Sequence, residues 1–125
     1  VPRFIERAKK NEPLSVFGDG TQSRTFTYVD DVVGAVVKMM EEPACVGQIM
    51  NLGGEEEITI KALAEKIITI TGSRSGIEYI PYEKVYSDDF DDMRRRVPSL
   101  EKIKKLIGYQ PSISLDVALK RLAAS

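Results

Sequence analysis

The sequence predicts a small α/β fold in which helices pack against a partly parallel sheet of short strands. Stretches rich in apolar and β-branched residues are short, and most are separated by longer segments with apolar residues at three- and four-residue spacing. This pattern is typical of strands alternating with amphipathic helices. Strands separated by helices favour parallel pairing over a meander of hairpins. The 125 residues suffice for one ordinary domain, and no repeat or linker divides them.

The first elements are a helix and two strands. Apolar residues at helical spacing predict a helix within residues 2–11, ended before Pro13. Residues 14–17 alternate large and small side chains and predict a strand, which the glycines of residues 18–20 close as a turn. Residues 25–29, rich in β-branched and aromatic side chains, predict a second strand.

A long apolar helix and a third strand follow. Asp30 is expected to cap the helix. The broad buried face of this helix is predicted to consist of Val32, Val33, Val36, Val37, Met39 and Met40. Residues 48–52 predict a short buried strand. The glycines in Asn51-Leu52-Gly53-Gly54 are interpreted as structural, because glycines after a strand usually permit a close turn.

The second half contributes three more helices and one strand. Thr59 is placed to cap a helix that ends before Gly72, and residues 77–81 predict a strand. Residues 82–98 show no period and predict a loop. Ser99 and Ser114 are expected to begin the two final helices. The acidic run within residues 88–92 is interpreted as a solvated face or as partners for the adjacent arginines, not as a metal site.

Composition excludes several classes of function. The chain holds 18 Lys plus Arg against 19 Asp plus Glu, so no basic excess is available for nucleic acid or an anionic membrane. No apolar run approaches the roughly 18 residues of a membrane span. The absence of His and the single Cys45 exclude the usual zinc sets, the Ser-His-Asp triad and the Cys-His dyad. No signal-peptide pattern follows Val1, so a cytoplasmic chain is expected.

The most informative segment spans residues 14–31. It predicts a strand, a glycine turn, Arg24 at the mouth of the next strand and a capped helix. A guanidinium binds phosphate well because its planar fork donates two parallel hydrogen bonds, and Phe17 offers a flat face for a base. The alternative is structural, with Phe17 in the core and Arg24 paired with Asp19 or Asp31 at the surface.

Four segments carry a resemblance to a known family. They are G-D-G-T-Q-S-R-T-F-T-Y-V-D-D-V, N-L-G-G, T-I-K-A-L-A and R-R-R-V-P-S-L-E-K-I-K-K-L-I-G-Y-Q-P. In this order, over essentially the whole chain, they resemble the carboxy-terminal part of the NAD-dependent nucleotide-sugar epimerases and dehydratases, which are extended short-chain dehydrogenases. The resemblance implies the fold of the substrate-binding part of such an enzyme. It also implies that residues 1–125 form a nucleotide-sugar-binding domain.

The resemblance also implies which parts of the enzyme lie elsewhere. In that family an amino-terminal Rossmann domain binds NAD(P) and carries a Tyr-x-x-x-Lys pair, and the sequence here holds neither that pair nor a G-x-G-x-x-G turn. The chain is therefore expected to hold no catalytic and no cofactor-binding residue, to bind no NAD(P) itself and to be inactive alone. Its implied partners are a nucleoside-diphosphate sugar and the Rossmann domain of a homodimeric parent.

The family's substrate contacts map onto six positions of this sequence. The base-pocket strand matches Leu14, Ser15 and Phe17, and the diphosphate arginine matches Arg24. In the second substrate segment, Asp92 matches the acidic residue that meets the ribose, and Arg95 matches a phosphate-binding arginine. The register among the three consecutive arginines 94–96 is open by one residue.

Two classes of function follow. The first is the nucleotide-sugar-binding portion, for a UDP- or dTDP-sugar, of an NAD-dependent epimerase, dehydratase or decarboxylase. The second is a non-catalytic α/β binding or interaction module, in which the glycine turn and the arginines are structural or bind another protein.

Overall fold

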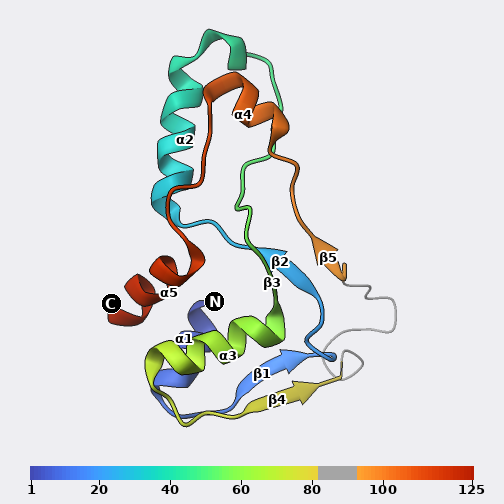
Figure 1. The fold of residues 1–125 in the computed structure, drawn as a ribbon, viewed down its shortest axis with the longest axis vertical. Helices are drawn as coiled ribbons and strands as arrows, with labels where there is room; N and C mark the ends of the chain where they lie inside the picture. Colours follow the sequence, from blue (N-terminus) through green and yellow to red (C-terminus); the bar gives the residue numbers. More distant parts are fainter. Residues whose placement is uncertain (82–92) are drawn as a thin grey trace. The chain divides into compact units, whose positions relative to one another are not determined.

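The computed structural model describes residues 1–81 and 93–125, which form two compact units (Figure 1). Unit 1 comprises Val1–Arg24, Ile58–Arg96 and Leu119–Ser125, and unit 2 comprises Thr25–Glu57 and Val97–Ala118. The acidic run, including Asp92, lies outside the described residues. Helices and short parallel strands confirm the predicted α/β class. No helix among the described residues is long and apolar enough to cross a membrane.

Unit 1 is built around two parallel strands and two helices. The elements are α1 (Pro2–Lys9), β1 (Leu14–Phe17), α3 (Ile60–Thr71) and β4 (Ile77–Ile80). β1 and β4 pair in parallel, and both helices contact β1 and each other. The apolar faces meet in a core of Ile5, Ala8, Leu14, Val16, Leu63, Ala64 and Ile67.

The predicted ends of α3 are confirmed. The hydroxyl of Thr59 accepts a hydrogen bond from the backbone N–H of Ala62 at 3.1 Å, which satisfies one of the free donors of the first turn. At the other end Gly72 has a φ of 63° and its N–H reaches back to the last turn. The sequence places both signals correctly because each acts within a few residues of the helix end.

A second sheet has the strand order β3-β2-β5, with β3 at Glu57–Thr59, β2 at Ser23–Thr25 and β5 at Arg95–Arg96. The predicted strand at residues 25–29 is therefore wrong in its bounds. Ser23 begins the strand because its N–H donates to the Arg94 carbonyl at 2.6 Å. The prediction of a loop throughout residues 82–98 is also wrong for β5. Its two arginines form a strand because they pair with β2, and no local sequence pattern indicates this strand.

Unit 2 packs two helices through a small core. The helices are α2 (Val29–Glu41) and α4 (Glu101–Ile107), with a short 3₁₀ turn, η1 (Pro43–Cys45), after the first. The core residues are Ala35, Leu100, Ile103 and Tyr109, with Met39, Met50, Leu52 and Ile107 packed against them. α5 (Leu115–Ala124) follows, and the Ser114 hydroxyl accepts from the Val117 N–H at 3.3 Å, as predicted.

Three local predictions in unit 2 are wrong. Tyr28, not Asp30, is the N-cap of α2, so Asp30 lies in the first turn, where its charge still favours the helix dipole. Leu100, not Ser99, is the N-cap of α4. Residues 48–52 form no strand, because within the described residues no neighbouring strand pairs with them.

The buried face of α2 is also smaller than predicted. Only Ala35 is buried, and Met39 is partly buried against the core. Val32 is partly buried as well, and the remaining residues of the predicted face are exposed: Val33 55%, Val36 43%, Val37 47% and Met40 82%. α4 contacts one side of α2, whereas the side that carries Val33, Val36, Val37 and Met40 stays exposed.

Candidate functional site

The strand β1 divides its side chains between core and surface. Leu14 and Val16 have no exposed surface, whereas Ser15 and Phe17 are partly exposed. This is the alternation expected of a strand with one buried face. The structure therefore places the Leu14 side chain in the core and leaves Ser15 and Phe17 as the accessible members of the predicted base-pocket strand.

The turn from β1 to β2 is held by hydrogen bonds from both of its sides. The Gly18 N–H donates to the Ile80 carbonyl at 2.8 Å, which continues the pairing of β1 with β4. The buried Gln22 side chain donates to the Phe17 carbonyl at 3.0 Å. The carboxylate of Asp19 accepts from the hydroxyl of Thr21 at 2.7 Å and from its backbone N–H at 3.0 Å. These bonds fix the direction in which the chain enters β2.

Electrostatics within this turn favour the charged form of Asp19. Hydrogen bonds from the Thr21 hydroxyl and N–H lower the pKa of Asp19 below its usual range, and the charge of Arg94 lowers the pKa further. The Asp19 carboxylate therefore interacts with Thr21 of the same turn and with the charge of Arg94.

The register of β2 against β5 decides which arginines share a face. Ser23 lies beside Arg95, and Arg24 lies beside Arg96. Residues directly beside each other in a sheet project to the same face, and successive residues project to opposite faces. Arg24 and Arg96 therefore share one face, and Arg95 projects to the other. Sequence reasoning left this register open, since three consecutive arginines give no local signal that distinguishes them.

The shared face of Arg24 and Arg96 suits an anion that carries more than one negative charge. Arg24 is partly exposed and its Nη1 donates to the Ser23 carbonyl at 2.7 Å, which orients the guanidinium along its strand. Arg96 is exposed. Two planar donors on adjacent strands can each bind phosphate oxygens through two hydrogen bonds. Asp92, the predicted ribose contact, lies outside the described residues.

The two glycines after the segment 48–52 are enclosed by backbone and side chains of unit 2. A Cβ added at Gly53 would lie 2.7 Å from Cγ of Pro98, and one at Gly54 would overlap the carbonyl oxygen of Phe26. The Tyr109 hydroxyl donates to the Gly53 carbonyl at 2.7 Å. These contacts support the structural interpretation of the glycine pair.

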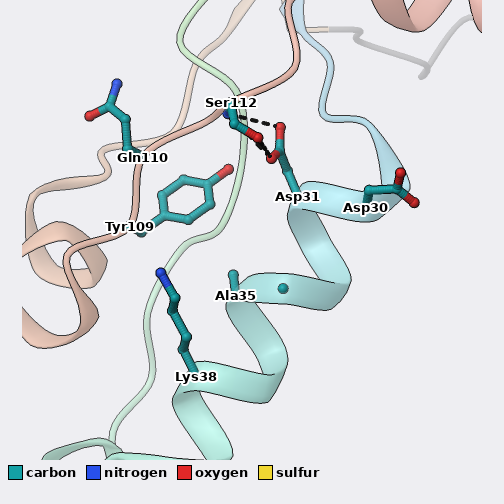
Figure 2. Close-up of a pocket in the computed structure, with 8 residues that line it drawn as sticks. Asp30, Asp31, Ala35, Lys38, Tyr109, Gln110 and Ser112 are labelled. Atoms are coloured by element: carbon teal, nitrogen blue, oxygen red, sulfur yellow. Dashed lines mark hydrogen bonds between the residues drawn. The ribbon is translucent and has the colours of Figure 1, made fainter.

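Unit 2 holds a cavity of about 290 Å³ beside α2. Figure 2 shows the carboxylate of Asp31 turned toward Ser112, and both residues line this cavity. Asp31 accepts from the Ser112 hydroxyl at 2.5 Å, from the Ser112 N–H at 3.1 Å and from the Ile113 N–H at 3.0 Å. The same cavity is lined by Lys38 and Tyr109. Its bonds join positions about 80 residues apart, so no spacing in the sequence predicts them.

The pKa values of two cavity residues move in opposite directions. Desolvation pushes the pKa of Asp31 upward, but the hydrogen bonds from Ser112 and Ile113 outweigh it and hold the pKa below its usual range. Desolvation raises the pKa of Tyr109, and the charges of Asp31 and Glu55 raise it further. At neutral pH Asp31 is thus an anchored carboxylate and Tyr109 a neutral hydroxyl donor. The hydrogen bonds of Asp31 hold the first turn of α2 to Ser112 and Ile113, so the role of this carboxylate is structural.

Replacing Asp31 by Asn is expected to lower the free energy of unfolding at pH 7 by about 1 kcal/mol, because the charge-assisted bonds are lost at a partly exposed site. The lowered pKa of Asp31 fixes the sign of the pH dependence: this stabilisation is present above the unfolded-state pKa and disappears as the pH falls through the folded-state pKa. Urea unfolding of both proteins at pH 7 and at acidic pH measures the difference. Ser112→Ala is the control and should lose about half as much. An Asp31→Asn deficit that persists unchanged in acid contradicts the assignment.

Comparison with known proteins shows that the chain is similar to part of several epimerases and decarboxylases whose names include a nucleotide sugar. Residues 1–53 match the model of the NAD dependent epimerase/dehydratase family. The UDP-N-acetyl-alpha-D-glucosaminuronate decarboxylase of Bacillus cytotoxicus is 40% identical over 120 residues, which are 96% of this chain and 37% of that protein. The chain thus spans little more than a third of this curated relative.

Solved structures agree with the sequence comparison. An epimerase from Methanothermobacter thermautotrophicus superposes with a TM-score of 0.89 at 29% identity, covering 98% of this chain and 35% of that one. The UDP-glucuronic acid 4-epimerase of Bacillus cereus, in complex with UDP-glucuronic acid and NAD, gives a TM-score of 0.85 at 27% identity, covering 98% of this chain and 37% of that one. These matches confirm the resemblance that the four sequence segments carry.

Proposed function

We propose, from the chain's relationship to the NAD-dependent epimerase/dehydratase family, that it binds the nucleoside diphosphate of a UDP- or dTDP-sugar for a longer epimerase, dehydratase or decarboxylase. The observation that carries the proposal is the parallel pairing of β2 with β5, which sets Arg24 beside Arg96. Residues 1–125 are accordingly assigned to substrate binding, and an interaction module without a ligand is the alternative that the experiment below distinguishes.

Each predicted site residue receives one role in this proposal. Phe17 and Ser15 project from the solvent-facing side of β1, where a flat base can stack and be met by a hydroxyl donor. Arg24 and Arg96 bind the diphosphate. Leu14 supports the strand from the core, and Arg95 lies on the opposite face of the second sheet from the other two arginines. The contact of Asp92 with the ribose remains a prediction.

Chemistry at the sugar requires groups that these residues do not supply. The chain has no G-x-G-x-x-G turn and no Tyr-x-x-x-Lys pair, so its residues do not fit NAD(P), and we assign cofactor and catalytic groups to the remainder of the longer protein. The contribution of this chain is binding energy from the non-reacting nucleotide, which positions the sugar for reaction. A cytoplasmic, homodimeric parent acting as an isomerase or lyase completes the proposal.

Substituting Arg24 or Arg96 by Ala is expected to weaken UDP binding by roughly ten- to a hundredfold, because each charge-assisted contact is worth about 1.5 to 3 kcal/mol. Calorimetric titration of UDP and of uridine separates the two parts of the ligand. UDP affinity should fall while uridine affinity changes little, since the arginines contact only phosphate. Lys at either position should restore part of the loss, because an ammonium cannot form the two-pronged contact.

Arg95→Ala is the matched control, as it removes the same charge from the opposite face of the sheet. Its UDP affinity should stay within about threefold of that of the unmodified protein, because this variant loses only a long-range charge interaction with the ligand. Equal UDP affinity of Arg24→Ala and the unmodified chain removes the case for a phosphate site and leaves the interaction module. A larger loss of UDP affinity for Arg95→Ala than for Arg96→Ala refutes the assignment of Arg96 to the phosphate site.

A further inference from the structure

The sheet of unit 1 has a second face, opposite its core. β1 and β4 run side by side (Figure 1), and both α1 and α3 contact β1. The buried residues of these helices share the core with Leu14 and Val16. Because successive residues of a strand project to opposite faces, Ser15 and Phe17 lie on the other side of the sheet. This second face is the one to which the proposed function assigns the base.

The register of β4 adds two side chains to this face. Ser15 lies beside Glu78, and Phe17 lies beside Ile80. Residues directly beside each other in a sheet project to the same face, on strands about 4.8 Å apart. The face is therefore divided into a polar pair, Ser15 with Glu78, and an apolar pair, Phe17 with Ile80. Glu78 is exposed, and the other three residues are partly exposed.

The polar pair has hydrogen-bonding capacity that the described part of the chain does not use. Within residues 1–81 and 93–125, neither the Ser15 hydroxyl nor the Glu78 carboxylate has a hydrogen-bond or ion-pair partner. A hydroxyl donates one hydrogen bond, and an ionised carboxylate only accepts. A donor and an acceptor thus lie side by side on the face that carries the aromatic ring of Phe17.

A uracil or thymine ring offers an edge that complements this pair. Its N3–H is a donor, and the carbonyls at C2 and C4, on either side of N3, are acceptors. A carboxylate that faces N3 accepts a charge-assisted hydrogen bond, and a neighbouring hydroxyl donates to one of the carbonyls. Cytosine carries no hydrogen on N3, so the carboxylate would face a lone pair there. Binding of the diphosphate by the arginines and stacking on Phe17 limit how far a cytosine ring can slide to avoid this repulsion.

We infer that Glu78 determines the base specificity of the proposed nucleotide site. Its carboxylate accepts from N3–H of uracil or thymine, while the Ser15 hydroxyl donates to an adjoining carbonyl. The inference rests on the proposed function and extends it from the phosphates to the base. No spacing in the sequence indicates Glu78, because only the pairing of β4 with β1 brings it beside Ser15.

Calorimetric titration of the chain with UDP and with CDP tests this specificity. The unmodified protein should bind UDP at least about tenfold more tightly than CDP. Glu78→Gln should reduce this ratio to about threefold or less, because the amide N–H can donate to N3 of cytosine and the charge-assisted bond to uracil is lost. An unchanged ratio in Glu78→Gln overturns the inference.

Glu65→Gln is the matched control. It removes the same charge from an exposed position on α3, which packs on the opposite face of the sheet. The ratio of UDP to CDP affinity should remain that of the unmodified protein. An equal fall of the ratio in Glu65→Gln and Glu78→Gln overturns the inference, because net charge and not contact with the base then sets the specificity.

N3-methyl-UDP provides a second measurement, which probes the hydrogen on N3 directly. The unmodified protein should bind it at least about tenfold more weakly than UDP. Glu78→Ala should remove most of this difference, because no carboxylate then faces the methyl group. Equal affinity of the unmodified protein for the two ligands overturns the inference. Tighter binding of GDP than of UDP also overturns it, since the carboxylate then accepts from the two neighbouring N–H donors of guanine.

The outcomes also separate this inference from the proposed function. Both Glu78 variants should keep the melting temperature of the unmodified protein, because the side chain is exposed. A fall in the melting temperature with an unchanged ratio of UDP to CDP affinity assigns Glu78 a structural role and overturns the inference. UDP binding that Arg24→Ala weakens and that shows no preference over CDP refutes the role of Glu78 alone. Absence of UDP binding by the unmodified protein refutes the proposed nucleotide site, and the role of Glu78 with it.

Discussion

Gly54→Ala should lower the free energy of unfolding by about 3 kcal/mol or more, enough to unfold a large fraction of a marginally stable protein. The added Cβ would overlap the carbonyl oxygen of Phe26, and its further neighbours are the backbone carbon and nitrogen of the same residue. Backbone cannot rotate away as a flexible side chain can, so relief requires moving the segment that leads into α2. Urea unfolding followed by circular dichroism measures the loss.

Gly34→Ala provides the matched control within the same unit. Nothing lies within 4 Å of the added Cβ at this position of α2, and alanine is the better helix former by about 0.5 to 1 kcal/mol. This variant should therefore be slightly more stable than the unmodified protein. A Gly54→Ala protein as stable as Gly34→Ala would show that the close approach to Phe26 is not a constraint on this fold.

Gly20→Ala should cost about 2 to 4 kcal/mol and should also weaken UDP binding. Gly20 has a φ of 76°, where a side chain costs roughly 1 to 2 kcal/mol. A Cβ there would in addition lie 2.9 Å from Cγ1 of Val16 and 3.0 Å from Cβ of Lys61. The carbonyl of Gly20 accepts from the Lys61 N–H at 3.0 Å, so relief of the clash moves the turn that leads to Arg24.

Gly76→Ala is the comparison for this second prediction. Gly76 also lies in unit 1, but its added Cβ meets nothing within 4 Å and its φ lies outside the left-handed region. The melting temperature and UDP affinity of the Gly76→Ala protein should remain close to those of the unmodified protein. If Gly20→Ala lowers stability without any effect on UDP affinity, the turn does not position the arginine.

Features that depend on a few neighbouring residues could be predicted from the sequence. The ends of α3 at Thr59 and Gly72, the strand β1 and the strand β4 all carry their signals within their own segments. The strand β2 shows the limit of local patterns. The aromatic residue Phe26, just after β2, suggested a strand further along the chain, whereas the hydrogen bond from the Ser23 N–H to the Arg94 carbonyl sets the actual start.

Some residues of the candidate site could likewise be predicted from the sequence, and others could not. Phe17 and Arg24 could be selected because their residue types suit a base and a phosphate. The choice between Arg95 and Arg96 could not be made, because it depends on pairing between strands about 70 residues apart. The exposure of the valines of α2 could not be predicted either, since periodicity shows that a helix face is apolar and does not show whether the rest of the chain covers it.

The two units are built from alternating segments of the chain, and this alternation affects how the protein folds. Unit 1 draws on three separate segments and unit 2 on two, so the backbone passes from one unit to the other four times. Neither unit can be excised as a continuous piece, and neither is complete during synthesis until α5 (Leu115–Ala124) has been made. Closing such long loops delays folding relative to a chain with local contacts. Removal of residues 119–125 should therefore destabilise unit 1, which holds the proposed nucleotide site.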